Sequence, residues 1–378
     1  VLITVEVTED YATRKNPDVA YDRVNNRYLM VYERGIVEYL YSEIWGRFIS
    51  ADGILGPEFR ISEDERCLAP KVAYNPVNKT FLVTWAYESY DEGLLIYAQI
   101  LNNEGEPYGN KGNFAVCPET VNGQYYPAVT ANTSTGDYLI AWEEQVDESN
   151  LKREIYGQLL DKEGNRISER LVLVSMPDYQ ESQVLAYSSA GNQYLLVFRD
   201  TTDYICSDIK GILFDSAGEP VSEAVLPIAV GDAEQYAHAL AVDANGRFLV
   251  LWEEYLADEG VYNIFGRFIN YDGTLAGDAF RVYQSENNQY APSAVFNTDG
   301  YFLVAWHDGL NKLYARYFTA EGSGLGEAVP IGPQEEEIGN VKVVYNSEEN
   351  NYLAIYTKYG GSGRIGVVII DIVSPVKL

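Results

Sequence analysis

Three glutamates occupy one recurring position and are the first candidates for chemistry in this sequence. Each follows an aromatic residue that ends a short apolar run, and the three are Glu33, Glu143 and Glu253. Repeated carboxylates could supply a general acid and a general base. The same segments later carry a polar partner, at Arg47, Gln158 and Arg267. In a fourth segment, the glutamate and its polar partner are both replaced. We therefore interpret each pair as a cross-strand contact within its own segment.

Residues that usually bind metals or act as nucleophiles are scarce. The 378 residues include two histidines and three cysteines, at His238, His307, Cys67, Cys117 and Cys206. No CxxC or HExxH motif is present, so the spacing of a zinc site is missing. The acidic loops could supply oxygen ligands to a structural calcium ion, but no stretch matches a calcium-binding motif. We therefore predict no cofactor, leave metal occupancy open, and regard a disulfide between Cys67 and Cys117 as conceivable.

The elements that position these residues come from an internal repeat. The run YLMVYE recurs six times in related form, and its final aromatic residue falls at Tyr32, Trp85, Trp142, Phe198, Trp252, Trp306 and Tyr356. The spacings lie between 50 and 57 residues. Each unit contains four short runs rich in β-branched and aromatic residues, separated by turn sequences such as SADG and DKEG. Four strands in each unit of this length are typical of a β-propeller blade.

We therefore predict an all-β fold, a seven-bladed β-propeller of four-stranded antiparallel blades in one domain. The approximate blades are 10–64, 65–119, 120–176, 177–230, 231–285, 286–333, and 334–372 together with 1–9. The last unit lacks a fourth strand of its own. In Val1–Glu9, apolar and polar residues alternate as in a strand, but this segment belongs to none of the seven units. We expect Val1–Glu9 to pair with Arg364–Ile372 and close the ring, which removes exposed strand edges. The aromatic residues of the repeat should pack between blades.

The repeat also resembles a known kind of sequence. The pattern P-x-V-A-Y, Y-L-V-x-W-E, I-Y-G-Q-x-x-D-x-x-G and F-x-V is similar to the propeller repeats of large secreted and cell-surface proteins. The best copies are Tyr126–Gly164 and Phe248–Gly273, and the resemblance covers all seven units. Units four and seven depart from it, since Phe198 and Tyr356 replace tryptophan and Ile212 replaces Arg or Gln. The resemblance implies an extracellular scaffold or adhesion role, although a fold does not by itself define a function.

Two sets of side chains are candidates for ligand binding. The inner strand of a propeller lines the central channel, and its candidate lining residues are Asp18, Lys71, Gln183, His238 and Ser293, with Ala128 and Val341 at the same position. A water-filled channel without a ligand is the alternative interpretation. Long acidic loops between the second and third strands carry candidate contact residues at Tyr39, Tyr41, Tyr87, Tyr90, Tyr255 and Tyr262. Such tyrosines suit a protein or glycan partner, although a solvated acidic rim is the alternative.

Charge narrows the class of partner. With 27 Lys and Arg against 56 Asp and Glu, the formal net charge is −29, which repels nucleic acid and anionic lipid. No apolar run is long enough to insert into a membrane. We therefore predict a non-enzymatic binding or adhesion module, extracellular or at a cell surface, that contacts a protein or polysaccharide through its long-loop face. The alternatives are a glycoside hydrolase or lyase with carboxylates at the channel mouth, or a structural subunit of a surface assembly. The oligomeric state stays open.

Overall fold

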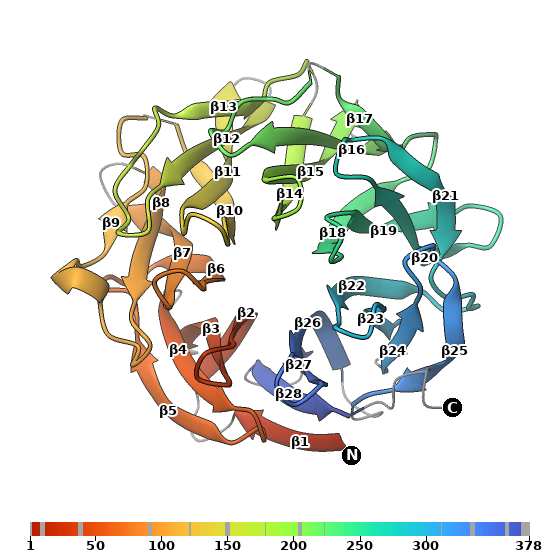
Figure 1. Cartoon of the computed structure of the whole chain (residues 1–378), viewed down its shortest axis with the longest axis horizontal. Helices are drawn as coiled ribbons and strands as arrows, with labels where there is room; N and C mark the ends of the chain where they lie inside the picture. The colour runs from red at the N-terminus through yellow and green to blue at the C-terminus, as the bar shows by residue number, and fades with distance from the viewer. Residues whose placement is uncertain are drawn as a thin grey trace.

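Seven four-stranded antiparallel sheets form a ring around a central channel in the computed structural model (Figure 1). The structure describes residues 2–7, 12–36, 41–89, 93–120, 122–147, 152–177, 179–202, 206–222, 224–310, 312–332, 337–359 and 363–371. Apart from one short 3₁₀ turn, η1 (Tyr108–Asn110), the regular elements of these residues are strands. The predicted seven-bladed β-propeller is therefore confirmed. No helix among these residues has the length and apolar character to cross a bilayer.

The strands of each blade run outward from the channel in chain order. The innermost strands are β2 (Ala12–Asp22), β6 (Cys67–Asn75), β10 (Gln124–Ala131), β14 (Tyr179–Ser188), β18 (Gln235–Val242), β22 (Gln289–Phe296) and β26 (Glu337–Asn346). The second strands are β3 (Arg27–Ile36), β7 (Thr80–Ser89), β11 (Tyr138–Asp147), β15 (Gln193–Thr202), β19 (Phe248–Leu256), β23 (Phe302–Asp308) and β27 (Asn351–Tyr359).

The outer half of each blade is built in the same way. The third strands are β4 (Ser42–Ser50), β8 (Gly93–Leu101), β12 (Lys152–Leu160), β16 (Cys206–Asp215), β20 (Val261–Ile269), β24 (Leu313–Phe318) and β28 (Arg364–Ile370). The outermost strands are β5 (Leu55–Arg60), β9 (Phe114–Ala115), β13 (Leu171–Val174), β17 (Leu226–Ala229), β21 (Leu275–Arg281), β25 (Gly324–Pro330) and β1 (Leu2–Val7). The hairpins between third and outermost strands use glycine at positive φ, such as Gly53 at 85°.

The ring closes through the N-terminal strand. Strand β1 pairs antiparallel with β28, from Leu2 opposite Ile370 to Val7 opposite Ile365. The last blade therefore consists of three strands from the end of the chain and one from its beginning, as predicted. Figure 1 shows β1 running along the outside of this blade, next to the first blade. This pairing fills the ladder of β28, which would otherwise be an open edge.

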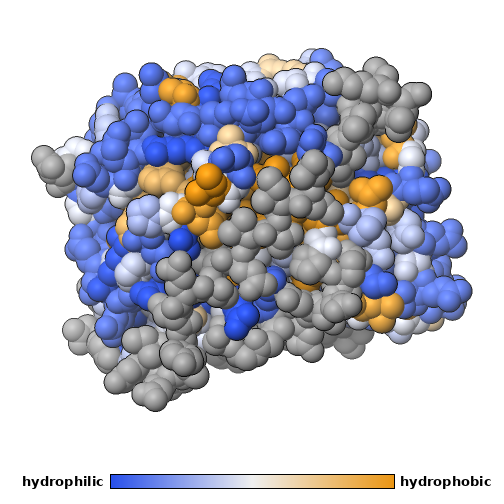
Figure 2. Space-filling model, turned by 90° about the horizontal axis from the view of Figure 1, so that it is seen from below, coloured by the Kyte–Doolittle hydropathy of each residue, from blue (hydrophilic) through white to orange (hydrophobic). Residues whose placement is uncertain are grey.

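The hydrophobic core lies between the blades. Each of its clusters combines residues from two neighbouring sheets, and Trp85, for example, packs with Ala20, Leu29 and Val31 of the preceding blade. The aromatic residues of the repeat are fully or almost fully buried in these clusters. The prediction that they are interblade packing residues is therefore confirmed. In the edge-on view of Figure 2, hydrophobic residues appear as separate spots among hydrophilic ones on the coloured part of the surface.

A β-bulge in each innermost strand shapes the channel mouth. In β2, Asn16 and Pro17 together oppose the single residue Tyr32, and in β6 Ala69 and Pro70 oppose Trp85. The first bulge residue has positive φ in six blades, at Asn16, Ala69, Tyr126, Ser182, Ala291 and Asn340. Non-glycine residues adopt this conformation rarely. The bulges lie in the first half of each inner strand, which is the end of the channel next to the loops between second and third strands.

Candidate functional site

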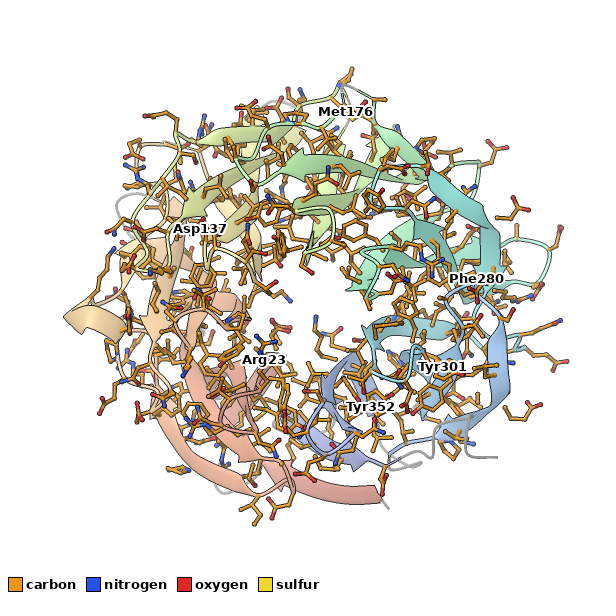
Figure 3. The ribbon with its side chains drawn as sticks, in the orientation of Figure 1. Arg23, Asp137, Met176, Phe280, Tyr301 and Tyr352 are labelled. Atoms are coloured by element: carbon orange, nitrogen blue, oxygen red, sulfur yellow. The ribbon has the colours of Figure 1, made fainter. Side chains whose placement is uncertain are left out.

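The bulges surround a cavity at one mouth of the central channel, which we call the axial cavity. It has a volume of about 510 Å³ and is lined by Asn16, Pro17, Asp18, Ala69, Lys71, Tyr126, Pro127, Glu143, Glu181, Ser182, Gln183, Ala291, Pro292, Asn340, Val341 and Lys342. Side chains fill the spaces between the blades but leave the centre of the ring open (Figure 3). The cavity therefore lies on the long-loop face, where the sequence placed the contact surface.

The repeated glutamates connect neighbouring blades around this cavity. The carboxylate of Glu33 accepts a hydrogen bond from the backbone N–H of Ala69 at 2.7 Å. Glu143 accepts one from Ser182 N at 2.9 Å, and Glu253 accepts one from Ala291 N at 2.6 Å. Each donor is the positive-φ bulge residue of the next blade. The glutamates therefore hold the strained bulges in place.

The predicted partner within the blade is wrong for this position, because the cross-strand hydrogen bond of Glu33 within its own blade comes from the Asn16 amide, at 2.6 Å, and not from Arg47. Glu33 lies opposite Ile44 in the strand register, and Arg47 lies opposite Met30. The Arg47 guanidinium instead donates to the carbonyl of Gly56. The arginine and the glutamate are three register positions apart, so their side chains serve different strands of the blade. The sequence pattern indicated the right residues but not the right partners.

The carboxyl group of Glu143 is buried at the wall of the cavity. Besides Ser182 N, it accepts a 2.6 Å hydrogen bond from the Arg153 guanidinium. The carboxylate side chain is almost fully buried, and this burial raises its pKa to about 7 against the opposing effect of the two hydrogen bonds. The Arg153 guanidinium stacks over the rings of Tyr125 at 4.5 Å and Tyr179 at 5.5 Å. Arg153 is therefore fixed in place and is not free to meet a ligand.

The other carboxylates of the axial cavity are also engaged. Glu181 accepts a 2.6 Å hydrogen bond from the Arg199 guanidinium. Asp18 accepts a 2.9 Å hydrogen bond from the backbone N–H of Val72, in the inner strand of the next blade. Its second oxygen lies 3.9 Å from the ammonium of Lys342. Each carboxylate that lines the cavity therefore already has a hydrogen-bond donor.

Two lysines of the cavity are different, because they keep their ammonium groups available. Lys71 is exposed and forms no ion pair or hydrogen bond with any residue that the structure describes. Lys342 has a side chain half-exposed to the channel, and its contact to Asp18 is long. Both line the axial cavity. These are the cations that a ligand could reach.

The structure places the predicted channel residues in three different situations. Asp18, Lys71 and Gln183 line the axial cavity. Ser293 is buried, and its hydroxyl accepts a 3.0 Å hydrogen bond from Val343 N of the next blade. The backbone of His238 belongs to β18, but its side chain lies outside the described residues. Ser293 therefore joins blades rather than facing the cavity.

Lys342 is the cavity residue that the sequence analysis missed. The first residue after the bulge is Lys71 in β6 and Lys342 in β26. The analysis assigned Val341 to this position because the seventh unit lacks the proline that marks it elsewhere. Aligning KVAYN (71–75) with KVVYN (342–346) would have matched the two lysines. The register of β14 likewise places Gln183 within the bulge, and not at the first position after it.

The predicted tyrosines separate into two groups. The rings of Tyr255 and Tyr262 contact each other with centroids 5.1 Å apart and planes tilted by 52°, and Tyr262 donates a 2.7 Å hydrogen bond to Glu234. Tyr41 and Tyr87 belong to the first two blades, where Tyr87 packs on Tyr97 and Tyr41 lies under the Arg66 guanidinium. Tyr39 and Tyr90 lie outside the described residues. The structure therefore brings Tyr255 together with Tyr262, but it does not bring all the predicted tyrosines into one surface.

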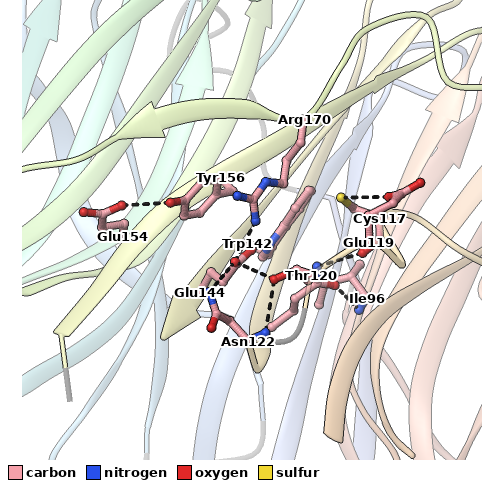
Figure 4. A network of polar contacts seen from close by, with 11 residues as sticks. Ile96, Cys117, Glu119, Thr120, Asn122, Trp142, Glu144, Glu154, Tyr156 and Arg170 are labelled. Atoms are coloured by element: carbon pink, nitrogen blue, oxygen red, sulfur yellow. Dashed lines mark hydrogen bonds and ion pairs between the residues drawn. The ribbon is translucent and has the colours of Figure 1, made fainter. Parts of the chain in front are cut away.

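A second polar site lies beside the third blade (Figure 4). The buried carboxylate of Glu144 accepts hydrogen bonds from Thr120 at 2.8 Å, Asn122 at 3.0 Å, Trp142 at 3.2 Å and Arg170 at 2.7 Å. Four donors saturate this carboxylate. The network therefore explains the local structure of the blade and leaves no group for chemistry.

The cysteines and the metal-ligand residues add no further site. Cys67 and Cys117 are both buried free thiols, so the conceivable disulfide between them is absent. Burial raises the pKa of Cys117 to about 11, and a thiol in this state is a poor nucleophile. Within the described part of the chain, no three His, Cys, Asp or Glu residues are placed to hold a metal ion.

Comparison with known proteins defines the fold. The sequence matches no family model and no curated protein at a significant level. In structure, the chain is similar to a protein of unknown function from Dyadobacter fermentans, with a TM-score of 0.62, 12% identity and coverage of 98% and 99% of the two chains. It is also similar to the polysaccharide lyase Uly1, with a TM-score of 0.59, 10% identity and coverage of 95% of this chain and 89% of the lyase. The α-L-arabinanase of Penicillium chrysogenum, in complex with arabinobiose, matches with a TM-score of 0.55 and 12% identity over 98% of each chain. At these identities the likeness shows the fold alone.

Proposed function

We propose that this propeller is a non-catalytic saccharide-binding module that holds its ligand in the axial cavity on the long-loop face. The observation that carries this proposal is the state of the cavity's polar groups. Its carboxylates are already bound, whereas two lysines and several amide and hydroxyl groups still face the space. Such a site can bind a polar ligand but has no evident acid and base pair.

Size and lining favour a saccharide over a protein surface. A cavity of about 510 Å³ lies within the range of small-ligand sites and can hold one or two sugar residues. Asn340 and Ser182 are suited to hydrogen bonds with sugar hydroxyls. Tyr126 is 57% exposed at the rim, where its ring can stack on a sugar face. Adhesion to a polysaccharide, and an extracellular or cell-surface location, are part of this proposal.

Loss of binding on removal of the rim tyrosines tests the proposal. Soluble glycans from a broad panel, neutral and acidic, would be titrated by calorimetry. We expect Tyr126→Ala to weaken binding of the best ligand about fivefold, since one stacking contact contributes about 1 kcal/mol. Tyr271→Ala is the matched control, because Tyr271 is 51% exposed but lies in a turn on the opposite face. Binding that survives Tyr126→Ala but is lost with Tyr271→Ala would move the site to the other face.

A carbohydrate-active enzyme is the second candidate, and Glu143 is the observation that favours it. A carboxyl with a pKa of about 7 in a cavity can act as a general acid near neutral pH. Glu181 lies in the same cavity, although Arg199 holds it. The assay is the release of reducing ends or of unsaturated sugars from the same glycan panel. Turnover that Glu143→Gln abolishes would establish the enzyme and overturn the non-catalytic proposal.

A structural subunit of a surface assembly is the remaining alternative. Size-exclusion chromatography and crosslinking across a range of protein concentrations would distinguish it from a monomeric binding module. Ordered oligomers with no glycan binding would favour the structural role.

A further inference from the structure

We propose that the saccharide is anionic and that Lys71 and Lys342 bind its carboxylate or sulfate group. This inference rests on the proposed function and names its ligand class. The two lysines occupy the same position of their blades, the first residue after the bulge of the inner strand. They lie on blades two and seven, on either side of Asp18 in the first blade.

The pairing of charges sets these two lysines apart. The other cations around the cavity have close carboxylate partners, at 2.6 Å for both Arg153 and Arg199. Lys71 has none among the described residues, and Lys342 has one at 3.9 Å. The chain as a whole carries a net charge of −29, so these two lysines provide positive charge within a largely negative molecule. Two of them at one cavity form a local positive site.

Asp18 does not cancel this site. One of its oxygens accepts the Val72 N–H, and the residue itself is buried below the channel surface. Burial within the ring, with a contribution from the positive charge of Lys342, lowers the pKa of Lys71, and Asp18 opposes this shift. By its accessible surface, the Lys71 side chain is nevertheless exposed to the cavity. An anion placed between the two lysines would be stabilised by both and would offset their mutual repulsion.

The neutral part of the cavity suits a sugar ring rather than a phosphorylated polymer. Asn340 lines the cavity next to the lysines, on the blade of Lys342, and Ser182 and Tyr126 line it from blades four and three. The overall negative charge repels a long polyanion such as nucleic acid, whereas one anionic residue at a chain end meets mainly the local lysines. We therefore expect recognition of a uronate or a sulfated sugar, presented as a short oligosaccharide.

The experiment compares matched oligosaccharides on the folded full-length chain by calorimetry. The ligands are a tetragalacturonate, the same tetrasaccharide with its carboxylates reduced to alcohols, and a sulfated tetrasaccharide. The variants are Lys71→Met, Lys342→Met and the double variant, each with its melting temperature measured. Lys162→Met is the control, because Lys162 also lies 3.9 Å from a carboxylate and is similarly exposed, but in a turn on the opposite face.

We expect each cavity variant to weaken binding of an anionic ligand about tenfold and the double variant more, because a charge-assisted hydrogen bond contributes about 1.5 kcal/mol or more. Lys162→Met should stay within about twofold of the wild type. Preference between tetragalacturonate and the sulfated ligand identifies the anionic group.

Two results would overturn the inference. Equal affinity for the acidic and the reduced tetrasaccharide would show that the site does not recognise the charge of the ligand. An unchanged affinity in the double variant would show that these two lysines do not recognise that charge. In both cases saccharide binding itself, and hence the proposed function, would stand. Absence of binding to every glycan, neutral or acidic, would instead reject the proposed function and this inference with it.

Discussion

The two sides of the axial cavity use polar residues in opposite ways. On the side formed by blades three and four, Glu143 and Glu181 are held by Arg153 and Arg199, and we call this the paired side. On the side formed by blades seven, one and two, Lys71 and Lys342 face the cavity without a close carboxylate partner among the described residues, and we call this the lysine side. The fold is the same on both sides, so the difference comes from side chains alone.

This difference separates groups that hold the ring together from groups that can meet a ligand. A buried carboxylate needs donors, and the paired side supplies them from neighbouring strands. A lysine at the channel surface is solvated by water and needs no partner to be tolerated. Polar residues on the paired side should therefore matter for stability, and those on the lysine side for binding.

The largest expected effect is on stability, from Arg153→Met on the paired side. The substitution leaves the buried Glu143 carboxylate without its cation, and such losses cost about 3 kcal/mol. Urea unfolding at pH 8, where Glu143 is ionised, measures the effect. At pH 5 the loss should be smaller, because Glu143 is then protonated in the folded state.

Lys71→Met is the matched change on the lysine side. We expect it to alter stability by no more than about 0.5 kcal/mol, as for other solvent-exposed positions. Equal destabilisation by the two variants would show that the distinction between the sides is wrong.

The second prediction concerns pH and Glu143. Its folded pKa of about 7 lies above the ordinary value of 4.5, so the folded state binds more protons between these pH values. Stability should therefore fall as pH rises from about 4.5 to 7, with a contribution from Glu143 on the order of 2 kcal/mol. Glu143→Gln should remove this contribution, which unfolding curves across the pH range would show. A wild type and a variant with parallel pH profiles would contradict the raised pKa.

The contrast between the sides also shows what sequence can and cannot predict. The aromatic residues and the hairpin glycines recur with their spacing, so the blades and the closing strand were predictable from local patterns. The link from Glu33 to the next blade was not, because the hydrogen bond from Ala69 joins two strands of different blades. Only the packing of blade against blade brings these two residues together.

The bulge explains the remaining errors. One inserted residue in each bulge shifts the register, so positions counted from proline fail where proline is absent, as at Gln183 and Val341. The first position after the bulge then serves two purposes: Lys71 and Lys342 line the cavity, whereas shorter polar side chains at the same position bond to the next blade. Asp18 and Ser293 show the outcome, since both accept a backbone N–H from the following blade.

The third prediction uses Ser293, which occupies the position of Lys71 in another blade. Ser293→Ala leaves the buried Val343 N–H without its acceptor, so we expect a loss of about 1 kcal/mol in stability. Thermal unfolding, with Ser293→Thr as a variant that keeps the hydroxyl, measures this. A neutral Ser293→Ala would indicate that Val343 N finds another acceptor, and the position would then not be structural in this blade.

The smallest expected effect is a gain in affinity, and it tests how far Asp18 weakens the positive charge of the lysine side. Asp18→Asn keeps an oxygen that can accept the Val72 N–H but removes the negative charge 3.9 Å from Lys342. At that distance in water a pair of charges interacts by about 1 kcal/mol, so an anionic tetrasaccharide should bind about three to five times more tightly. Binding of the carboxyl-reduced tetrasaccharide should not change, and neither should the melting temperature. A weaker affinity for both ligands would mean that Asp18 contacts the sugar directly. The lysine side would then bind hydroxyl groups of the sugar as well as its anionic group.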